Sequence, residues 1–206
     1  LTPFFNPMHH VVLALLKAAS KILWGLRVIH PEKLEIDNSV IVANHQSYLD
    51  MVWIACSLPA DKRRDVYVTG KRRLSFLRFI FPVLPIIYVD DENGIEVLKA
   101  GADILRSGKT LIIFPEGTRT DDGTVHEFRS GAAYLARNLG KRVIPVSVSG
   151  AYSIWPRHRR LPRIFTSVKG GLNIGNPIDP SQYDSTESLN AAMMESVKAG
   201  LEQGLF

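Results

Sequence analysis

The feature that most constrains the fold is a regular alternation of short β-type runs and helical patterns after Pro31. The β-type runs are rich in Val and Ile, and the segments between them place apolar residues at helical spacing. This alternation is typical of an α/β domain with a mostly parallel central sheet flanked by helices. Strands are predicted at residues 39–43, 65–69, 86–89, 110–114, 143–148 and 166–171. Helices are predicted at residues 48–57, 74–79, 92–107, 130–139 and 185–202.

Length and composition favour one folded domain preceded by a helix. The chain has 206 residues, of which 46% are apolar and 22% charged, as in ordinary globular proteins. Because no repeat or linker divides the chain, we predict an N-terminal amphipathic helix within residues 1–30 and a single domain over residues 31–206. The one cysteine, Cys56, excludes an intrachain disulfide.

Residues 11–28 form the predicted N-terminal amphipathic helix. Lys17, Ser20, Lys21 and Arg27 share one sector of the helical wheel, opposite a broad apolar face. The longest stretch without a charge is far shorter than the ~20 residues that span a bilayer. Two interpretations stay open: the helix lies in a membrane interface, or it packs on the domain's own core.

The first candidate site lies where the predicted strand 39–43 ends. His45 follows the strand, and Asp50 lies five residues further on, near the start of the predicted helix. Positions five apart on one helix point about 140° away from each other, so the two side chains meet only if a turn separates them. A histidine is the natural general base near neutral pH, and an aspartate on its other nitrogen fixes the tautomer. The alternative is a simple capping box of Ser47 and Asp50.

The second candidate site is the run Phe-Pro-Glu-Gly-Thr-Arg at residues 114–119, which also follows a predicted strand. Gly117 lets the backbone approach a ligand closely, and the planar guanidinium of Arg119 matches a phosphate. Glu116 either fixes Arg119 or contacts a substrate hydroxyl. In parallel sheets, ligands bind beyond the carboxyl ends of strands, where both candidate sites lie.

The formal charge of +5 favours an anionic partner. Basic runs lie at residues 62–64, 71–73 and 157–160, and Trp155 beside the last of them suits the rim of an anionic membrane. We do not expect nucleic-acid binding, because the aromatic residues are not interleaved with the basic ones. We also expect no metal, because the histidines other than His45 show no ligand spacing.

Taken together, these motifs resemble the glycerophospholipid acyltransferase family. The family's HxxxxD box matches at residues 45–50, and its Phe-Pro-Glu-Gly-Thr-Arg block matches fully at residues 114–119. Its Phe-Lys-x-Gly appears as Phe-Arg-Ser-Gly at residues 128–131. Its late Val-Pro-Val block is similar to residues 143–146. The motifs occur in the family's order, from about Ile36 to Gly150.

The resemblance implies transfer of a fatty acyl group from acyl-CoA or acyl-carrier protein to a hydroxyl of a lysophospholipid such as 1-acyl-glycerol-3-phosphate. It implies His45 as general base, Asp50 as its orienting carboxylate, and no cofactor beyond the donor. The substrate-binding residues it implies are Glu116, Gly117, Thr118, Arg119, Lys71 and Arg72. It also implies a peripheral or monotopic protein on the cytoplasmic side of a membrane with anionic lipid.

Two positions depart from the family's pattern. Arg73 stands where many members have an acidic residue, and Asp91 stands where an arginine is commonly assigned to the acceptor phosphate. Because an aspartate repels a phosphate, we expect Arg72, Arg73 or Arg119 to compensate, or the acceptor to be a different lipid.

Three rival hypotheses stay open at this point. The same His-Asp pair also suits a thioesterase or hydrolase that activates water. The domain is alternatively a catalytically silent lipid-binding module, although such a module has no reason to keep both His45 and Asp50. Finally, the absence of an initiating Met suggests the acyltransferase part of a longer chain.

Overall fold

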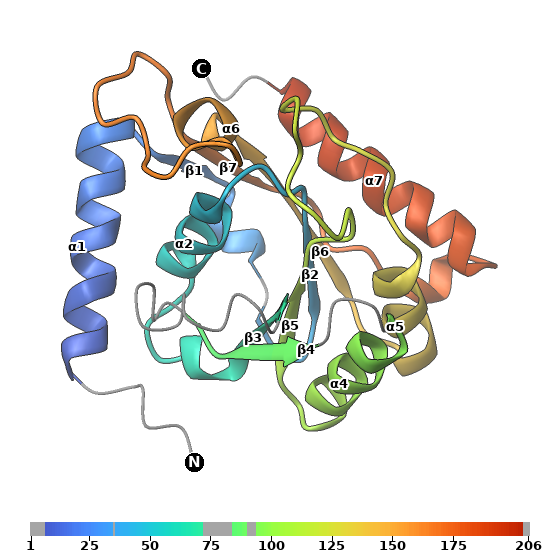
Figure 1. The fold of residues 1–206 in the computed structure, drawn as a ribbon. Coiled ribbons are helices and arrows are strands. Elements are labelled where there is room, and N and C mark those ends of the chain that lie inside the picture. The colour runs from blue at the N-terminus through green and yellow to red at the C-terminus, as the bar shows by residue number, and fades with distance from the viewer. Residues whose placement is uncertain (1–6, 35, 72–83, 90–93, 204–206) are drawn as a thin grey trace.

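The structure is a computed structural model that describes residues 7–34, 36–71, 84–89 and 94–203. Within these residues, seven strands form one sheet in the order β1-β7-β6-β2-β5-β3-β4 (Figure 1). The strands are β1 (Arg27–Ile29), β2 (Val40–Ala43), β3 (Val66–Lys71), β4 (Ile86–Val89), β5 (Thr110–Ile113), β6 (Val143–Ser149) and β7 (Gly171–Ile174).

The sheet is mostly parallel, as predicted. Strand β2 at its centre pairs in parallel with β5 on one side and β6 on the other. Strand β3 continues the parallel arrangement between β5 and β4. Only β7 runs antiparallel to β6, and β1 pairs in parallel with β7. The carboxyl ends of β2, β5 and β3 therefore lie at one edge of the sheet.

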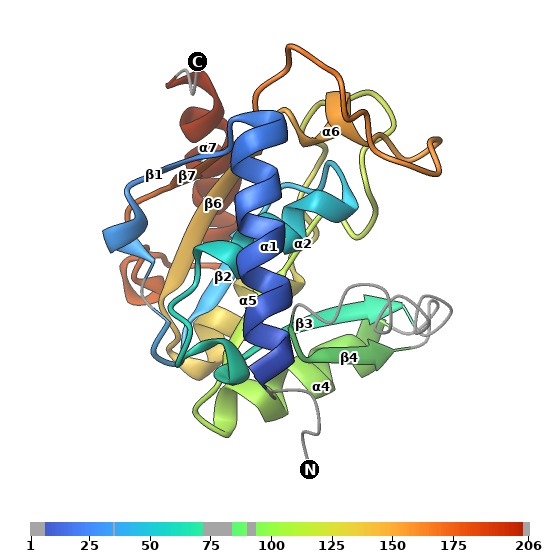
Figure 2. The same ribbon diagram turned by 90° about the vertical axis from the view of Figure 1, so that its left-hand side faces the viewer.

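Helices cover both faces of the sheet, so the fold has three layers (Figures 1 and 2). Helices α1 and α2 lie on one face and α4, α5 and α7 on the other. The helices are α1 (Pro7–Trp24), α2 (Tyr48–Ser57), α4 (Gly94–Arg106), α5 (Gly131–Leu139), α6 (Ala151–Ile154) and α7 (Thr186–Glu202). Short 3₁₀ turns occur at Pro31–Lys33, Arg63–Asp65 and Pro180–Gln182.

The central strands are mainly apolar, as expected for strands whose two faces are both buried. Every residue of β2 and β5 is buried, and their side chains alternate between two cores. Ile41 and Ile112 belong to the core beneath α1 and α2. Val40 and Leu111 belong to the core beneath α4, α5 and α7.

Helix α1 packs on the domain's own core, as one of the two interpretations of its sequence predicted, and the membrane-interface interpretation stays a prediction. Its inner side packs against α2 and buries Leu13, Ser20 and Trp24. Its outer side leaves Val11 and Ile22 57% and 81% exposed. The structure corrects the polar sector of the wheel, because Ser20 lies on the buried side. No described helix is long and apolar enough to cross a bilayer.

Several predicted boundaries were wrong. The N-terminal helix was expected to reach Val28, but it ends at Trp24, and Gly25 has a φ of 55°. The chain then enters β1, which the sequence analysis missed together with α6. Both are too short to show a clear period.

The position predicted for the last strand, residues 166–171, was also wrong. The observed strand, β7, begins at Gly171, where its pairing with Ser149 of β6 begins. The Thr and Val residues before it favour a strand by propensity, but none of the described strands pairs with them. The helix expected at residues 74–79 lies outside the described residues. The division of the chain at residue 30 stays a prediction.

Candidate active site

The parallel pairing of β2 with β5 brings the two sequence motifs together. His45 follows β2 and residues 114–119 follow β5, so both motifs leave the sheet at the same edge. The imidazole of His45 stacks on the ring of Phe114, with centroids 4.2 Å apart and planes inclined by 22°. Thr120, just after the second motif, donates its N–H to the carbonyl oxygen of His45 at 2.8 Å.

Asp50 both caps helix α2 and holds the His45 ring. Helix α2 begins at Tyr48, with Ser47 as its N-cap in a capping box. One carboxylate oxygen, Oδ2, accepts hydrogen bonds from His45 Nδ1 at 2.8 Å, from Gln46 N at 2.6 Å and from Ser47 N at 2.7 Å. The capping box and the His-Asp pair therefore coexist, because three donors converge on one oxygen.

This arrangement assigns the imidazole tautomer. All three groups donate to Oδ2 only if Nδ1 of His45 carries a proton, and in the neutral ring this leaves Nε2 as the unprotonated nitrogen. No hydrogen bond to Nε2 is found among the described residues, and the His45 side chain is 21% exposed. In the neutral ring the pair thus leaves an acceptor nitrogen on a partly exposed side chain.

Burial dominates the electrostatics of Asp50. The carboxylate is fully buried, and its second oxygen, Oδ1, has no hydrogen-bond partner in the described part of the chain. Burial raises the pKa of Asp50, while the His45 ring and the Ser47 and Gln46 amides oppose the rise. Desolvation therefore strengthens the attraction between this carboxylate and a protonated His45.

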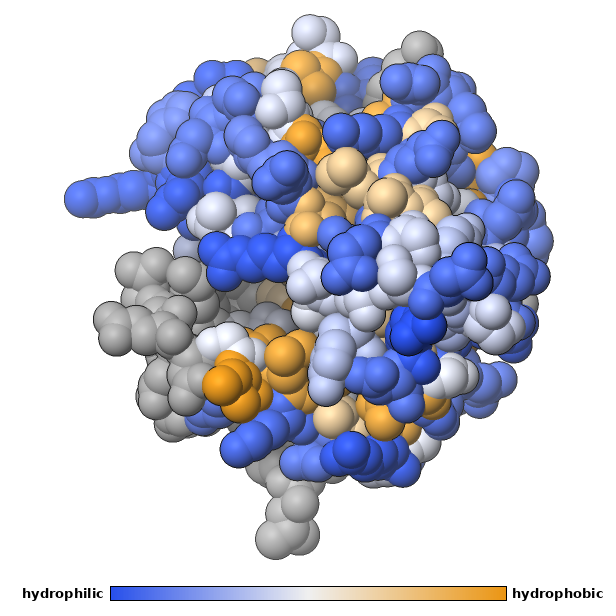
Figure 3. All heavy atoms as spheres, turned by 90° about the vertical axis from the view of Figure 1, so that its right-hand side faces the viewer, coloured by the Kyte–Doolittle hydropathy of each residue, from blue (hydrophilic) through white to orange (hydrophobic). Residues whose placement is uncertain are grey.

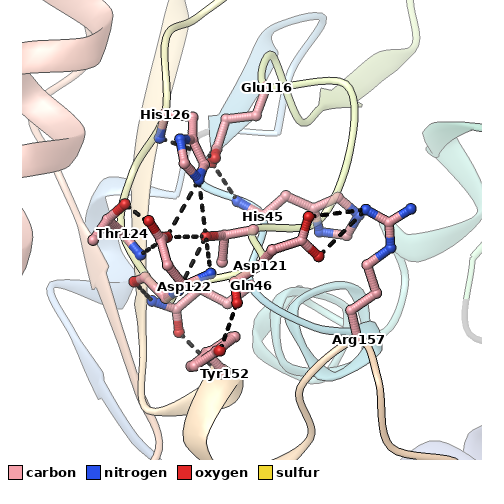
Figure 4. Close-up of polar contacts among 11 residues, drawn as sticks. His45, Gln46, Glu116, Asp121, Asp122, Thr124, His126, Tyr152 and Arg157 are labelled. Atoms are coloured by element: carbon pink, nitrogen blue, oxygen red, sulfur yellow. Dashed lines mark hydrogen bonds and ion pairs between the residues drawn. The ribbon is translucent and has the colours of Figure 1, made fainter.

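Glu116 connects the strand end that carries His45 with the loop after the second motif (Figure 4). Its Oε1 accepts the His45 N–H at 2.8 Å, and its Oε2 accepts the His126 N–H at 3.1 Å. The side chain is only 6% exposed, and burial raises its pKa against these hydrogen bonds. Glu116 therefore positions the backbone of the catalytic candidate, a function that the sequence analysis did not assign to it.

Gly117 occupies a backbone conformation that favours glycine. Its φ is 74°, and an added Cβ would lie 3.1 Å from the Arg129 guanidinium carbon. Its N–H donates to the carbonyl oxygen of Phe114 at 3.0 Å, so this N–H is not free to donate to a ligand. Arg129, from the Phe-Arg-Ser-Gly segment at residues 128–131, therefore packs directly on the motif at residues 114–119.

Arg119 lies over the ring of Tyr48, with its guanidinium carbon 3.7 Å from the ring centroid. Its Nη1 is buried and has no partner in the described residues. Burial lowers the pKa of Arg119, and the nearby charge of Arg157 lowers it further. A partly desolvated guanidinium with an unused donor is suited to an anionic group.

Arg157 joins this region from the loop after α6 (Figure 4). Its Nη1 lies 3.3 Å from the Thr118 hydroxyl and 3.5 Å from the Asp121 carboxylate. Thr118 itself is exposed. The sequence analysis placed Arg157 in a basic run but did not connect it with the second motif, because the connection spans 39 residues.

Lys71 and Arg72 were the other predicted substrate-binding residues. Lys71 ends β3, at the same edge of the sheet as His45. Arg72, together with Arg73 and Asp91 at the departures from the family pattern, lies outside the described residues. Their functions stay predictions.

Sequence reasoning also missed polar residues that hold the site together. Asn44 donates to the Val148 carbonyl oxygen at 2.9 Å and accepts the Val148 N–H at 2.7 Å. Gln46 donates to the Gly123 carbonyl oxygen and accepts the Tyr152 N–H, at 3.3 and 3.2 Å. The signal available was a polar residue on each side of His45 directly after an apolar strand.

The part of the chain that the structure describes contains no cluster of three His, Cys, Asp or Glu side chains suited to a metal ion. His126 contacts Asp122 at 3.3 Å and the Thr120 hydroxyl at 3.2 Å. These contacts organise the loop over residues 120–126.

Comparisons with known proteins agree with the motifs. A family model described as Acyltransferase matches residues 25–149. A chloroplastic 1-acyl-sn-glycerol-3-phosphate acyltransferase of Arabidopsis thaliana is 28% identical over 182 residues, covering 84% of this chain and 48% of the relative. The 1-acyl-sn-glycerol-3-phosphate acyltransferase of Haemophilus influenzae is 28% identical over 190 residues, covering 87% of this chain and 75% of the relative.

A solved structure extends the similarity to the fold. The crystal structure of the 1-acyl-sn-glycerophosphate acyltransferase from Thermotoga maritima superposes with a TM-score of 0.72 at 28% identity. The match covers 95% of this chain and 81% of that protein. The chain spans about half the length of the Arabidopsis relative.

Proposed function

Because the chain belongs to the acyltransferase family, we propose that it transfers a fatty acyl group from a thioester, acyl-CoA or acyl-carrier protein, to the hydroxyl of a lysophospholipid such as 1-acyl-glycerol-3-phosphate. The observation that carries this proposal is the 2.8 Å hydrogen bond between His45 Nδ1 and the buried Asp50 carboxylate. It leaves Nε2 to act as the base toward a bound hydroxyl.

In the proposed reaction, His45 Nε2 removes the proton of the acceptor hydroxyl as that oxygen attacks the thioester carbonyl carbon. Asp50 stabilises the imidazolium that forms. The carbon–sulfur bond then breaks, and His45 returns the proton to the leaving thiolate, so the products are an ester and a free thiol. A covalent acyl-enzyme is not required, because the thioester is already activated.

The acceptor phosphate is proposed to bind at Arg119. Support comes from Nη1 of Arg119, which is buried and has no hydrogen-bond partner among the described residues, and from the second cation, Arg157, beside it. Lys71, Arg72, Gly117 and Thr118 stay proposed substrate contacts. Glu116 also stays a proposed acceptor contact, although each of its oxygens already accepts a backbone N–H.

The membrane interface is the proposed location of the reaction, on its cytoplasmic side. The exposed apolar residues on the outer side of α1, Val11, Leu15 and Ile22, support this placement. A helix lying in the interface brings the site within reach of lipid acceptors and acyl chains.

A matrix of acyl donors and lysophospholipid acceptors, scored by mass spectrometry of the lipid product, tests the proposed activity. The matched variant is His45→Asn, because the asparagine amide replaces the Nδ1 donor to Asp50 but offers no base at the Nε2 position. We expect ester formation to fall by about 10²–10⁴-fold, with the circular dichroism spectrum and the melting temperature close to wild type.

The same assay separates the rival activities. Free fatty acid that forms at the same rate with and without an acceptor would establish a thioesterase in place of an acyltransferase. Near-wild-type ester formation by purified His45→Asn would overturn the proposed base. Vesicle binding without turnover for every donor would support a silent lipid-binding module.

A further inference from the structure

Residues 156–170, here called the basic loop, connect α6 with β7 and contain no helix or strand. In Figures 1 and 2 the loop projects from the body of the molecule beside the C-terminal end of α1. Three large apolar side chains of the loop are exposed to solvent: Leu161 by 73%, Ile164 by 51% and Phe165 by 97%. A nearly fully exposed phenylalanine beside two exposed aliphatic residues is unusual for a surface that contacts only water.

The basic loop also carries the net charge of the whole chain. It contains five Arg and Lys residues and no Asp or Glu, whereas the rest of the chain has twenty basic and twenty acidic residues. The basic residues are Arg157, Arg159, Arg160, Arg163 and Lys169. The loop is therefore a concentrated cationic surface with an apolar tip.

Hydrogen bonds fix the backbone of the basic loop, so its apolar residues are presented by an ordered structure. Arg163 N donates to the Ile154 carbonyl oxygen at 2.8 Å. Trp24 Nε1, from the end of α1, donates to the Arg163 carbonyl oxygen at 2.8 Å. Gly170 N donates to the Trp24 carbonyl oxygen, also at 2.8 Å. The loop and the C-terminal end of α1 are thus one connected unit.

The start of the basic loop is equally well connected to the candidate active site. Ser47, the N-cap of the helix that carries Asp50, donates its hydroxyl to the Trp155 carbonyl oxygen at 2.8 Å. Trp155 Nε1 donates to the Arg159 carbonyl oxygen at 3.1 Å. A surface that binds this loop is therefore held at a fixed position relative to His45.

From these observations we infer that the basic loop is a second membrane anchor, which inserts Phe165, Ile164 and Leu161 into an anionic lipid surface while its arginines contact the headgroups. The inference rests on the proposed function, because it names the surface that supplies the lipid substrates. Cationic residues around an apolar tip match a bilayer with anionic lipid. An acidic protein partner would account for the arginines but not for the exposed Phe165.

The opposite face of the molecule provides a contrast. The face covered by α4, α5 and α7 is mostly hydrophilic, with scattered apolar side chains (Figure 3). Tyr134 of α5 and Lys198 of α7 are exposed there, and they supply matched control positions.

The test is cosedimentation with vesicles of phosphatidylcholine alone and with phosphatidylglycerol added. We expect the double variant Ile164→Ser/Phe165→Ser to lower partitioning onto anionic vesicles about ten-fold or more. Arg160→Gln is expected to lower it roughly five-fold, less at high salt. The controls Tyr134→Ser and Lys198→Gln are expected to bind as wild type.

A second experiment measures directly whether residue 165 enters the acyl-chain region of the bilayer. In Phe165→Trp, vesicles with brominated acyl chains are expected to quench the added fluorescence beyond the quenching of wild type. Acyl transfer to a lysophospholipid in detergent micelles is expected to be unchanged in the loop variants. If the protein transferred no acyl group but its vesicle binding still depended on the basic loop, the proposed function would be overturned and the membrane anchor would be supported.

Two outcomes would overturn the anchor. The first is vesicle binding by Ile164→Ser/Phe165→Ser equal to that of wild type, with no excess quenching in Phe165→Trp. The second is capture of an acyl-carrier protein that depends on Arg160 while vesicle binding does not, which would make the loop a carrier-protein site.

Discussion

A single oxygen of Asp50 accepts three hydrogen bonds, and this explains how one residue serves both helix α2 and the His45 ring. The spacing of five residues predicted that His45 and Asp50 can meet only across a turn, and in the structure they do meet, with a turn between them. The contacts of Glu116 could not be predicted in the same way. Its partners are backbone N–H groups, which every residue type except proline supplies, so no residue pattern marks the contact.

At the residue scale, Gly117→Ala tests the tight packing of the second motif. A residue with a side chain at φ 74° costs about 1–2 kcal/mol, and the added Cβ would also displace Arg129. We expect lower unfolding free energy and weaker acyl transfer, measured by urea denaturation and by the mass-spectrometric assay.

Gly108→Ala is the control for Gly117→Ala, because its φ is 78° and nothing lies within 4 Å of an added Cβ. It should lose similar stability while keeping its acyl transfer activity. Equal losses of activity in both variants would show that the contact with Arg129 has no functional effect.

At the element scale, the placement of β2 against β6 depends on Asn44 in addition to the backbone ladder. The Asn44 side chain pairs with both polar groups of Val148, across 104 residues, and is 1% exposed. This contact fixes the end of β2, directly before His45, against a neighbouring strand.

Asn44→Ala is therefore expected to lower the unfolding free energy by about 1–3 kcal/mol, because it leaves the buried N–H and carbonyl of Val148 without partners. Urea denaturation measures the change. Asn138→Ala, at an exposed position of α5, should stay within about 0.5 kcal/mol of wild type. A wild-type midpoint for Asn44→Ala would contradict the assignment.

Asp122, in the loop at residues 120–126, is expected to make the stability of the fold depend on pH. Hydrogen bonds from the Thr124 N–H and from the Thr120 and Thr124 hydroxyls hold the pKa of Asp122 well below its usual range. A carboxyl whose pKa is lower in the folded state contributes stability above its unfolded pKa of about 3.9, and the contribution is lost as the pH falls below that value.

We therefore expect Asp122→Asn to be less stable than wild type at neutral pH, with a gap that narrows on acidification. Urea denaturation at a series of pH values measures the gap. Thr124→Val, which keeps the N–H donor and removes one hydroxyl donor, should show a smaller dependence. A gap that stays constant down to about pH 2, well below the unfolded pKa of about 3.9, would refute the explanation.

At the scale of the whole molecule, Cys56 reports on the docking of α1. The thiol is 1% exposed between α2 and α1, 3.7 Å from the Leu13 carbonyl oxygen. Burial raises its pKa to about 11. At pH 8 the thiolate fraction is then about 10⁻³, against roughly a quarter for an ordinary thiol with a pKa of about 8.5.

We expect native Cys56 to react with a disulfide reagent at least about 10²-fold more slowly than the urea-unfolded chain. Acceleration on anionic vesicles would show that membrane binding separates α1 from α2. Labelling of the free protein at the rate of a model thiol would show that α1 is not stably docked.

The sequence by itself determined the features that depend on local pattern. The alternation of β-type runs and helical patterns predicted the mostly parallel sheet and the bounds of α2. It also placed the two motifs directly after β2 and β5. These features were predictable because apolar periodicity and capping residues act over a few neighbouring positions. The sequence did not determine the edge strand β1 or its neighbour β7, whose pairing depends on backbone groups that have no residue signature.

Only the tertiary structure decided how the site is supported and how the basic loop is joined to it. Glu116 beneath His45, Asn44 against Val148, and Trp24 against Arg163 each join residues more than seventy positions apart. Such contacts form because the sheet order places distant segments side by side, and a hydrogen bond to a backbone group selects geometry rather than residue type.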